Sequence, residues 1–285
     1  MKRIILVSLV CIMAGFMAVG CENTDEEIEA IKQWVLEDTT YFDASTPEDT
    51  APDQSTLAMM PMAIDTVDSA FYWWRGKQTS DTTDIEVDVV DDSGWVEWTR
   101  HHAAALNVFA FDSDSANWVH WAKDYDETTR IRGIFRKTGT DADPYMGWTL
   151  ERISCAVGSS DNSSVSIDSI KLLTQTDEIL LQAPFEEEFF HVDSLVKFKS
   201  LEQISITLYA NDEETVAHLH TILLWPVRDT FSNAGGGVHE GTWNAQLWES
   251  LRYAIFDLMK ASSLYEQDGE YDYDGVLLPY VISNE

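Results

Sequence analysis

Alternating carboxylates near the C-terminus have the clearest spacing for chemistry in this sequence. They occupy every second position of the stretch DGEYDYDG, as Asp268, Glu270, Asp272 and Asp274. Calcium ions prefer flexible loops of this kind, which are rich in oxygen ligands. A shorter acidic loop contains Asp112 and Asp114. Neither loop has the EF-hand pattern, so we expect each to be either a Ca²⁺ site or a solvated acidic turn.

Two histidines in the stretch AHLHTILL have a spacing that suits a metal site. His218 and His220 are two positions apart, so in a strand both imidazoles lie on one face. Some zinc sites begin this way, but no third ligand follows directly, and only the His-Glu pair at 239–240 offers one. The alternative is two histidines on the solvated face of a strand. The adjacent pair at 101–102 points to opposite faces and suits a metal less well.

Tryptophans are the candidate ligand-binding residues. Trp95 and Trp98 face opposite sides of a strand, and Trp118 and Trp121 raise the same question. An exposed Trp beside carboxylates is a platform on which a sugar ring can stack. The alternative is that these rings fill a core or a seam between domains. Carboxylates are so numerous that no pair of them can be singled out for glycoside hydrolysis.

The strands that would carry these residues are predicted from alternation. An amphipathic helix is expected at about 25–38, followed by a hairpin that turns at 91–94. Further strands are expected at 104–111, 131–137 and 148–157. A helix laid on a curved antiparallel sheet resembles the NTF2-like cone or a small lipocalin-like barrel. This resemblance covers roughly residues 24–165 and supplies no catalytic motif.

The small polar stretch GSSDNSSVS marks a predicted boundary, with an α+β domain at 21–165 and an all-β domain at 166–285. The order ISITLYA, FSNAGGGVHEGTW and VLLPYVI resembles the Ig-like or fibronectin-like C-terminal domains of uncharacterised bacterial lipoproteins. The expected fold is therefore mainly β (α+β), with an N-terminal helix on a curved sheet followed by an Ig-like β-sandwich. Pro279 suits an edge strand. Residues 245–262 fit both helix and strand, and we expect a helical turn followed by a strand.

The N-terminal residues predict where the protein is located in the cell. Lys2 and Arg3 precede an apolar run at 4–19, which is short for a membrane-spanning helix. The run ends in AVGC, which resembles the lipobox of bacterial lipoproteins. That resemblance implies that the leader at 1–20 is removed and that acyl chains anchor Cys21 to a bilayer. Glu22 after the cysteine favours the outer membrane or cell surface, and the alternative is an ordinary signal peptide.

The remaining cysteine is expected to be structural. Cys11 would leave with the leader and Cys21 would carry lipid, so Cys155 has no partner for an internal disulfide. Cys155 lies between Ile153 and Val157 in an apparent strand, which is typical of a small buried hydrophobe.

The net charge and the absence of several catalytic motifs limit the functions that the sequence allows. The formal charge is −32, which excludes nucleic acid as a partner and predicts a generally acidic surface, or carboxylates that gather divalent cations. P-loop, G-x-S-x-G and H-E-x-x-H motifs are absent from the sequence. We therefore expect a non-enzymatic lipoprotein that binds or scaffolds a protein or glycan partner at the envelope. The alternatives are a carbohydrate-binding or carbohydrate-processing lipoprotein with a Trp-lined groove, and a carrier of a small ligand.

Overall fold

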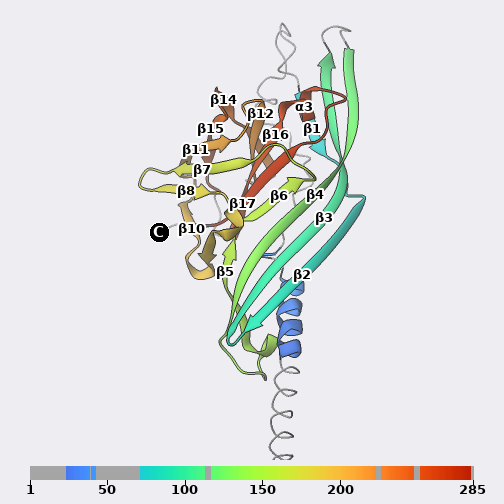
Figure 1. The fold of residues 1–285 in the computed structure, drawn as a ribbon. Helices are drawn as coiled ribbons and strands as arrows, with labels where there is room; N and C mark the ends of the chain where they lie inside the picture. Colours follow the sequence, from blue (N-terminus) through green and yellow to red (C-terminus); the bar gives the residue numbers. More distant parts are fainter. Residues whose placement is uncertain are drawn as a thin grey trace, which may run out of the picture.

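A computed structural model describes residues 24–38, 40–42, 71–112, 117–222, 226–246 and 251–283, and the predicted leader and Cys21 lie outside these ranges. The described chain is mainly β and antiparallel, as predicted, with one longer helix at residues 24–37 (Figure 1). No helix among the described residues is long and apolar enough to cross a membrane.

A long two-stranded ribbon runs the length of the molecule (Figure 1). It consists of β3 (Ser93–Asp112) and β4 (Asn117–Lys137), which pair residue by residue along their whole length. β2 (Ser80–Val90) pairs with the first half of β3 through a turn at 91–92, within the predicted turn at 91–94, and β1 (Phe71–Arg75) pairs with the second half. The strands predicted at 104–111 and 131–137 are therefore parts of two much longer strands.

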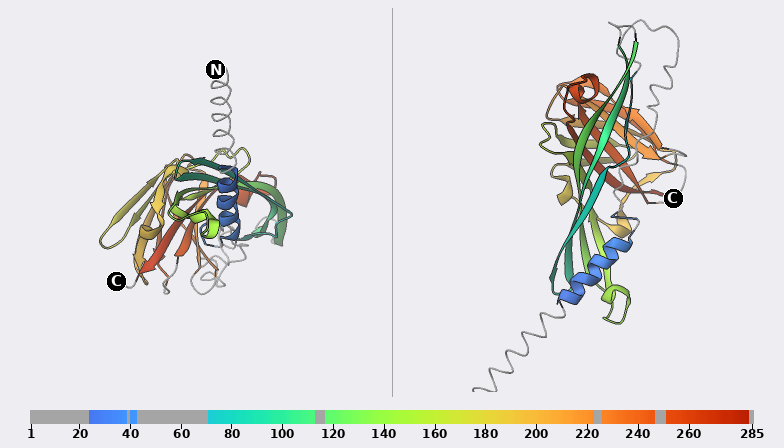
Figure 2. Two further views of the ribbon diagram at one scale, coloured as in Figure 1. Left: turned by 90° about the horizontal axis from the view of Figure 1, so that it is seen from below. Right: turned by 90° about the vertical axis from the view of Figure 1, so that its right-hand side faces the viewer.

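The N-terminal helix covers the inner face of this ribbon at one end (Figure 2). Ile31 and Val35, from the predicted apolar stripe, are buried. Gly94 permits the close approach, because a Cβ there would lie 2.7 Å from the Ile31 side chain. The Trp34 ring meets Phe135 of β4 edge to face at 5.0 Å, and Glu27 pairs with Lys137 at 2.6 Å.

Two sheets form the rest of the body. The larger has twelve described strands, in the order β1-β3-β4-β6-β17-β16-β12-β13, with β2 beside β3, β5 beside β4 and β9, and β10 parallel to β17. The smaller has the order β14-β15-β11-β7-β8. Besides β1 to β4, the larger sheet contains β5 (Trp148–Ser154), β6 (Ala156–Ser160), β9 (Phe189–His191), β10 (Val196–Lys199), β12 (Thr215–Ile222), β13 (Pro226–Thr230), β16 (Leu251–Lys260) and β17 (Tyr273–Ser283).

Five described strands form the smaller sheet, and four short helical segments lie between strands of the chain. The strands are β7 (Ile167–Leu173), β8 (Glu178–Gln182), β11 (Gln203–Ala210), β14 (Ser232–Gly235) and β15 (Val238–Asn244). The helical turns are η1 (Pro144–Gly147), η2 (Phe185–Glu187), η3 (Val192–Ser194) and α3 (Ala261–Tyr265). One core joins the two sheets, because Ile170 and Leu208 from the smaller sheet pack with Phe256 and Leu278 from the larger.

The C-terminal strands join the two predicted parts of the chain. The predicted boundary after residue 165 falls between β6 and β7, and strands from both sides of it share the larger sheet, since β17 pairs with β6. The expectation that Pro279 marks an edge strand is wrong, because β17 has neighbours on both sides. Pro279 is tolerated because β6 pairs with residues 274–277 and β10 with residues 280–283, which leaves its position unpaired on that side.

The ambiguous segment at 245–262 contains the predicted strand, as β16. The helical turn predicted before this strand would fall at residues 247–250, which lie outside the described residues, and the short helix α3 follows the strand. Residues 254–259 are all buried, so both faces of β16 are covered and its apolar residues are continuous instead of alternating.

Candidate functional site

A buried group of charged side chains lies where β1 and the ribbon meet the C-terminal strands. Its members lie on β1, β3, β4, β12, β16 and β17 and in the loop before β17. We call it the Arg75 cluster; it comprises Arg75, His102, Glu127, His220, Asp257, Tyr271 and Tyr273. Every member except the partly buried Tyr271 is at most 4% exposed. Charges are rarely buried to this extent without partners.

Asp257 is held by three donors. Its carboxylate lies 2.8 Å from Arg75 Nη1 and 2.9 Å from His220 Nε2, and it accepts a 2.8 Å hydrogen bond from the Tyr273 hydroxyl. Burial alone would raise the pKa of Asp257, but the charges of Arg75 and His220 and their hydrogen bonds hold it well below its ordinary value. Asp257 is therefore an ionised, fully paired carboxylate.

Glu127 is the second anion of the cluster. Its Oε2 lies 2.9 Å from His102 Nε2, and its Oε1 accepts a 3.0 Å hydrogen bond from the Tyr271 hydroxyl. Arg75 reaches the same side, with Nε donating to Tyr271 at 3.1 Å and Nη2 at 3.9 Å from Glu127. The predicted opposite facing of the 101–102 pair is confirmed, because His101 is exposed while His102 is buried in this cluster.

A second arginine lies beside the Arg75 cluster, stacked on a tryptophan. The Arg228 guanidinium lies 3.8 Å from the centre of the Trp73 ring, and its Nη1 donates to the Trp73 carbonyl at 3.1 Å. The His218 ring lies 5.2 Å from the same ring, and its Nδ1 is 3.0 Å from Thr230 Oγ1. The stacking extends the buried polar layer from β1 to β12 and β13.

The histidines at 218 and 220 share a face, as expected, but that face is buried. The alternative of a solvated face is therefore wrong. His239 lies in the other sheet, where its Nε2 is 2.9 Å from Thr215 Oγ1, and burial lowers its pKa. Among the described residues, no group of three or more His, Cys, Asp or Glu side chains is placed to hold a metal ion.

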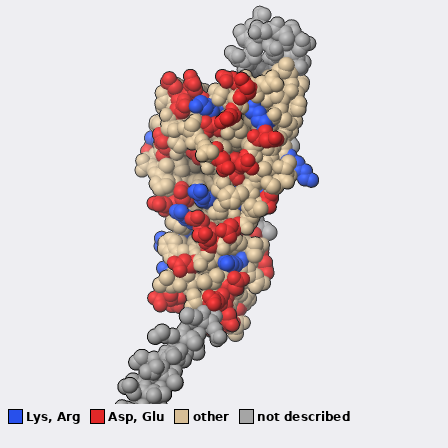
Figure 3. Space-filling view, turned by 45° about the vertical axis from the view of Figure 1, so that its right-hand side comes forward, with Lys and Arg blue, Asp and Glu red and all other residues tan. Residues whose placement is uncertain are grey.

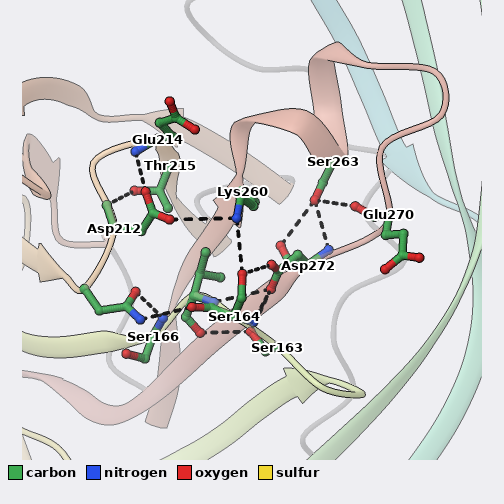
Figure 4. A network of polar contacts seen from close by, with 12 residues as sticks. Ser163, Ser164, Ser166, Asp212, Glu214, Thr215, Lys260, Ser263, Glu270 and Asp272 are labelled. Atoms are coloured by element: carbon green, nitrogen blue, oxygen red, sulfur yellow. Dashed lines mark hydrogen bonds and ion pairs between the residues drawn. The ribbon is translucent and has the colours of Figure 1, made fainter.

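Asp272, one of the four alternating carboxylates near the C-terminus, holds a neighbouring loop (Figure 4). Asp272 accepts hydrogen bonds from the Ser163 hydroxyl at 2.9 Å, from the Ser164 amide at 2.9 Å and from the Ser164 hydroxyl. Burial opposes ionisation of Asp272, but these hydrogen bonds lower its pKa. Asp268 and Glu270 are exposed. In the other predicted loop, Asp114 and the side chain of Asp112 lie outside the described residues.

Asp274 faces a small cleft between β4, β6, β17 and the loop at 183–186. The cleft has a volume of ≈ 210 Å³ and is also lined by Arg130 and Glu186. Asp274 accepts a 2.7 Å hydrogen bond from the Ile167 amide. Burial, together with the charges of Glu186 and Asp257, raises the pKa of Asp274 to about 7. This carboxyl therefore changes charge near neutral pH.

The predicted tryptophan sites separate onto different faces. Trp95 is 50% exposed on the outer face of the ribbon, while Trp98 is 8% exposed and packs in the core under the helix. Trp121 packs against the core beneath β1, and the side chain of Trp118 lies outside the described residues. Trp95 and Trp98 cannot line one groove, so the predicted ligand surface reduces to Trp95. Its ring meets Phe189 edge to face at 6.0 Å.

A second aromatic surface lies on the outer face at the other end of the ribbon. We call it the outer aromatic strip; it consists of Tyr72, Trp74, Phe109 and His120. Trp74 stacks on His120 with ring centres 5.8 Å apart and planes 11° apart, and Tyr72 lies 5.4 Å from Trp74. Phe109 is 38% exposed and pairs across the strands with both Tyr72 and His120.

Neither this strip nor the Arg75 cluster was predicted from the sequence. Tyr72 and Trp74 are two positions apart in FYWWR, which was the only local signal that they share a face. Arg75 and Asp257 are 182 residues apart, and β3, β4, β6 and β17 separate their strands in the order of the larger sheet, so no local pattern places the two side chains together. Cys155 is fully buried, and burial raises the pKa of its thiol, with Glu188 adding to the shift, in line with a structural role.

No known family model, curated protein or solved structure matches this chain.

Proposed function

We propose that this chain is a lipid-anchored binding protein of the cell envelope, held at the outer membrane or cell surface through Cys21 and not an enzyme. The anchor is supported by the lipobox-like AVGC at the end of the apolar leader. Binding is supported by one structural observation: the outer face of the long ribbon carries aromatic rings at both ends.

That observation matters because solvent-facing positions of a sheet are usually polar. Trp95 and Phe109 are both large and exposed. Trp95 contacts Phe189, and Phe109 lies across the strands from Tyr72 and His120. Exposed aromatic surfaces of this kind mark interaction sites, and Tyr and Trp are enriched at them. The ribbon offers a rigid base, because β3 and β4 pair along their whole length.

A binding role fits the disposition of the charged groups better than a catalytic one. Asp257, Glu127 and Arg75 pair with one another or with tyrosines and histidines below the surface. We also propose that residues 166–285 are related to Ig-like domains. This relation is supported by two sheets that share one core and are antiparallel except for the β10–β17 pair.

Carbohydrate is a second, more specific candidate ligand, which the surroundings of Trp95 favour. Asp88 lies directly across from Trp95 on β2, and Glu97 follows two positions along β3 on the same face. A flat indole ring with carboxylates nearby can stack on a sugar and accept hydrogen bonds from its hydroxyls.

A screen of the full-length protein against a glycan array tests this candidate. We expect one class of glycan to bind the unaltered chain and to bind Trp95→Ala about tenfold more weakly, because the stacking surface is removed. Tyr209→Ala, which removes another exposed aromatic ring on the smaller sheet, is the matched control and should bind normally. Equal binding by the unaltered chain and Trp95→Ala, or no glycan binding at all, would contradict the carbohydrate proposal.

A further inference from the structure

The outer edge of β2 is a long strand edge that has no pairing partner among the described strands. Among the described strands that have one neighbour only, β2 is the longest, with 11 residues. Its register with β3 is uninterrupted from Ser80 to Val90, and it contains no proline. In an antiparallel pair, alternate residues turn their backbone groups away from the partner, so along its other edge β2 has a row of donors and acceptors that pair with no described strand.

The side chains of β2 divide into two rows. Ile85, Val87 and Val89 are half-buried and pack against the core beneath the helix at 24–37. This apolar row is incompletely covered at the edge of the sheet. A further strand beside β2 would continue the layer if its inward side chains were apolar.

The outward row is acidic. Asp84, Glu86 and Asp88 are exposed, and none of them has an ion-pair partner within the described ranges. The residues opposite them on β3 are Thr99, Glu97 and Trp95, and Glu97 is already paired with Arg132 at 2.7 Å. Acidic side chains also predominate over Lys and Arg on the face seen in Figure 3. The potential along this edge therefore favours a basic partner.

A second copy of the chain is a poor occupant of this edge. Two β2 strands side by side would place their acidic rows on the same face, where like charges opposite one another destabilise the pairing. Basic side chains at the same positions would instead meet opposite charges. We propose that the β2 edge binds an extended segment of a partner protein in which basic and apolar residues alternate, by adding it as a new strand.

This inference goes beyond the proposed function, because it concerns a sheet edge and a protein partner. It can fail while glycan binding at Trp95 stands, and the reverse also holds. The probe is a short peptide in which Lys and Val alternate, added to the full-length protein. Binding is followed by calorimetry, and amide hydrogen exchange in Ser80–Val90 reports whether the strand becomes paired.

Control peptides separate strand addition from simple charge attraction. A peptide of the same composition but without alternation, and an alternating peptide N-methylated along its backbone, should each bind about tenfold more weakly. The alternating peptide should also slow amide exchange in Ser80–Val90, and the control peptides should not. Equal binding of all three peptides, or unchanged amide exchange, would overturn the proposal.

Charge reversal on the protein provides the second arm. The triple variant Asp84→Lys, Glu86→Lys, Asp88→Lys should bind the peptide at least about tenfold more weakly. The matched control reverses the exposed acids Asp124, Asp126 and Asp161, which lie away from this edge and change the net charge equally. It should bind within about twofold of the unaltered chain. If both triple variants lose binding to the same extent, the attraction is a property of net charge and the edge site is refuted.

Discussion

Replacing Arg75 by Met should lower the free energy of unfolding by about 3–5 kcal/mol, the usual cost of breaking a buried ion pair from one side. The substitution removes the 2.8 Å partner of Asp257 and the donor to Tyr271. Met fills much of the same volume, so the loss comes mainly from a buried carboxylate that has lost its arginine and keeps only His220 and Tyr273 as partners. Urea unfolding followed by tryptophan fluorescence measures it.

Two further variants identify the cause of this loss. The double variant Arg75→Met, Asp257→Asn also removes the negative charge of Asp257 and should recover part of the lost stability. Arg100→Met is the surface counterpart, because Arg100 binds Asp81 with distances of 2.8 and 2.7 Å at the edge of the sheet. It should cost no more than about 1 kcal/mol. If Arg75→Met costs as little as Arg100→Met, the Arg75 cluster does not stabilise the fold in the way described.

Asp274→Asn should abolish a pH dependence of stability between about pH 4 and pH 7. The pKa of Asp274 is about 7 in the folded chain, raised mainly by burial, whereas an unfolded Asp titrates near 4. Between these values the folded state holds a proton that the unfolded state has lost. Protonation of Asp274 therefore stabilises the protein fully below about pH 4, and this stability is lost as the pH rises through 7.

The size of this effect follows from the shift of about three pKa units, which corresponds to about 4 kcal/mol. Asn stays neutral and retains an acceptor for the Ile167 amide, so the variant should match the unaltered chain at pH 4 and be more stable at pH 8. Unfolding free energies measured across this range test the prediction. Asp168→Asn, at an exposed position on β7, is the control. Parallel pH curves for the unaltered chain and Asp274→Asn would contradict it.

The periodicity of apolar residues was sufficient to predict the strands and the helix that expose one face to solvent. The acids of β2 alternate with Ile85, Val87 and Val89, and this alternation predicts the strand and its hairpin. The helix was predicted from Ile28, Ile31 and Val35, which recur at helical spacing. β16 was ambiguous because both its faces are buried, which removes the alternation that separates a strand from a helix.

The candidate sites were harder to predict than the elements, because they depend on contacts between residues that are far apart in the sequence. Nothing near Arg75 in the sequence indicates that its partner is Asp257, and the histidines at 218 and 220 resemble a metal pair until the neighbouring strands bury them. The positions of Trp95 and Trp98 were predictable as opposite faces. The sequence did not indicate which of the two faces is solvated, because this depends on where the helix packs.

Lipid attachment at Cys21 is the central proposal, because it places the folded chain at a membrane, together with its two candidate binding surfaces, the aromatic outer face of the ribbon and the β2 edge. The intact mass of the protein purified from its native membranes tests it most directly. We predict a polypeptide that begins at Cys21 and is heavier than residues 21–285 by its acyl chains. A chain that retains residues 1–20, or one that carries a free thiol at Cys21, would contradict the proposal.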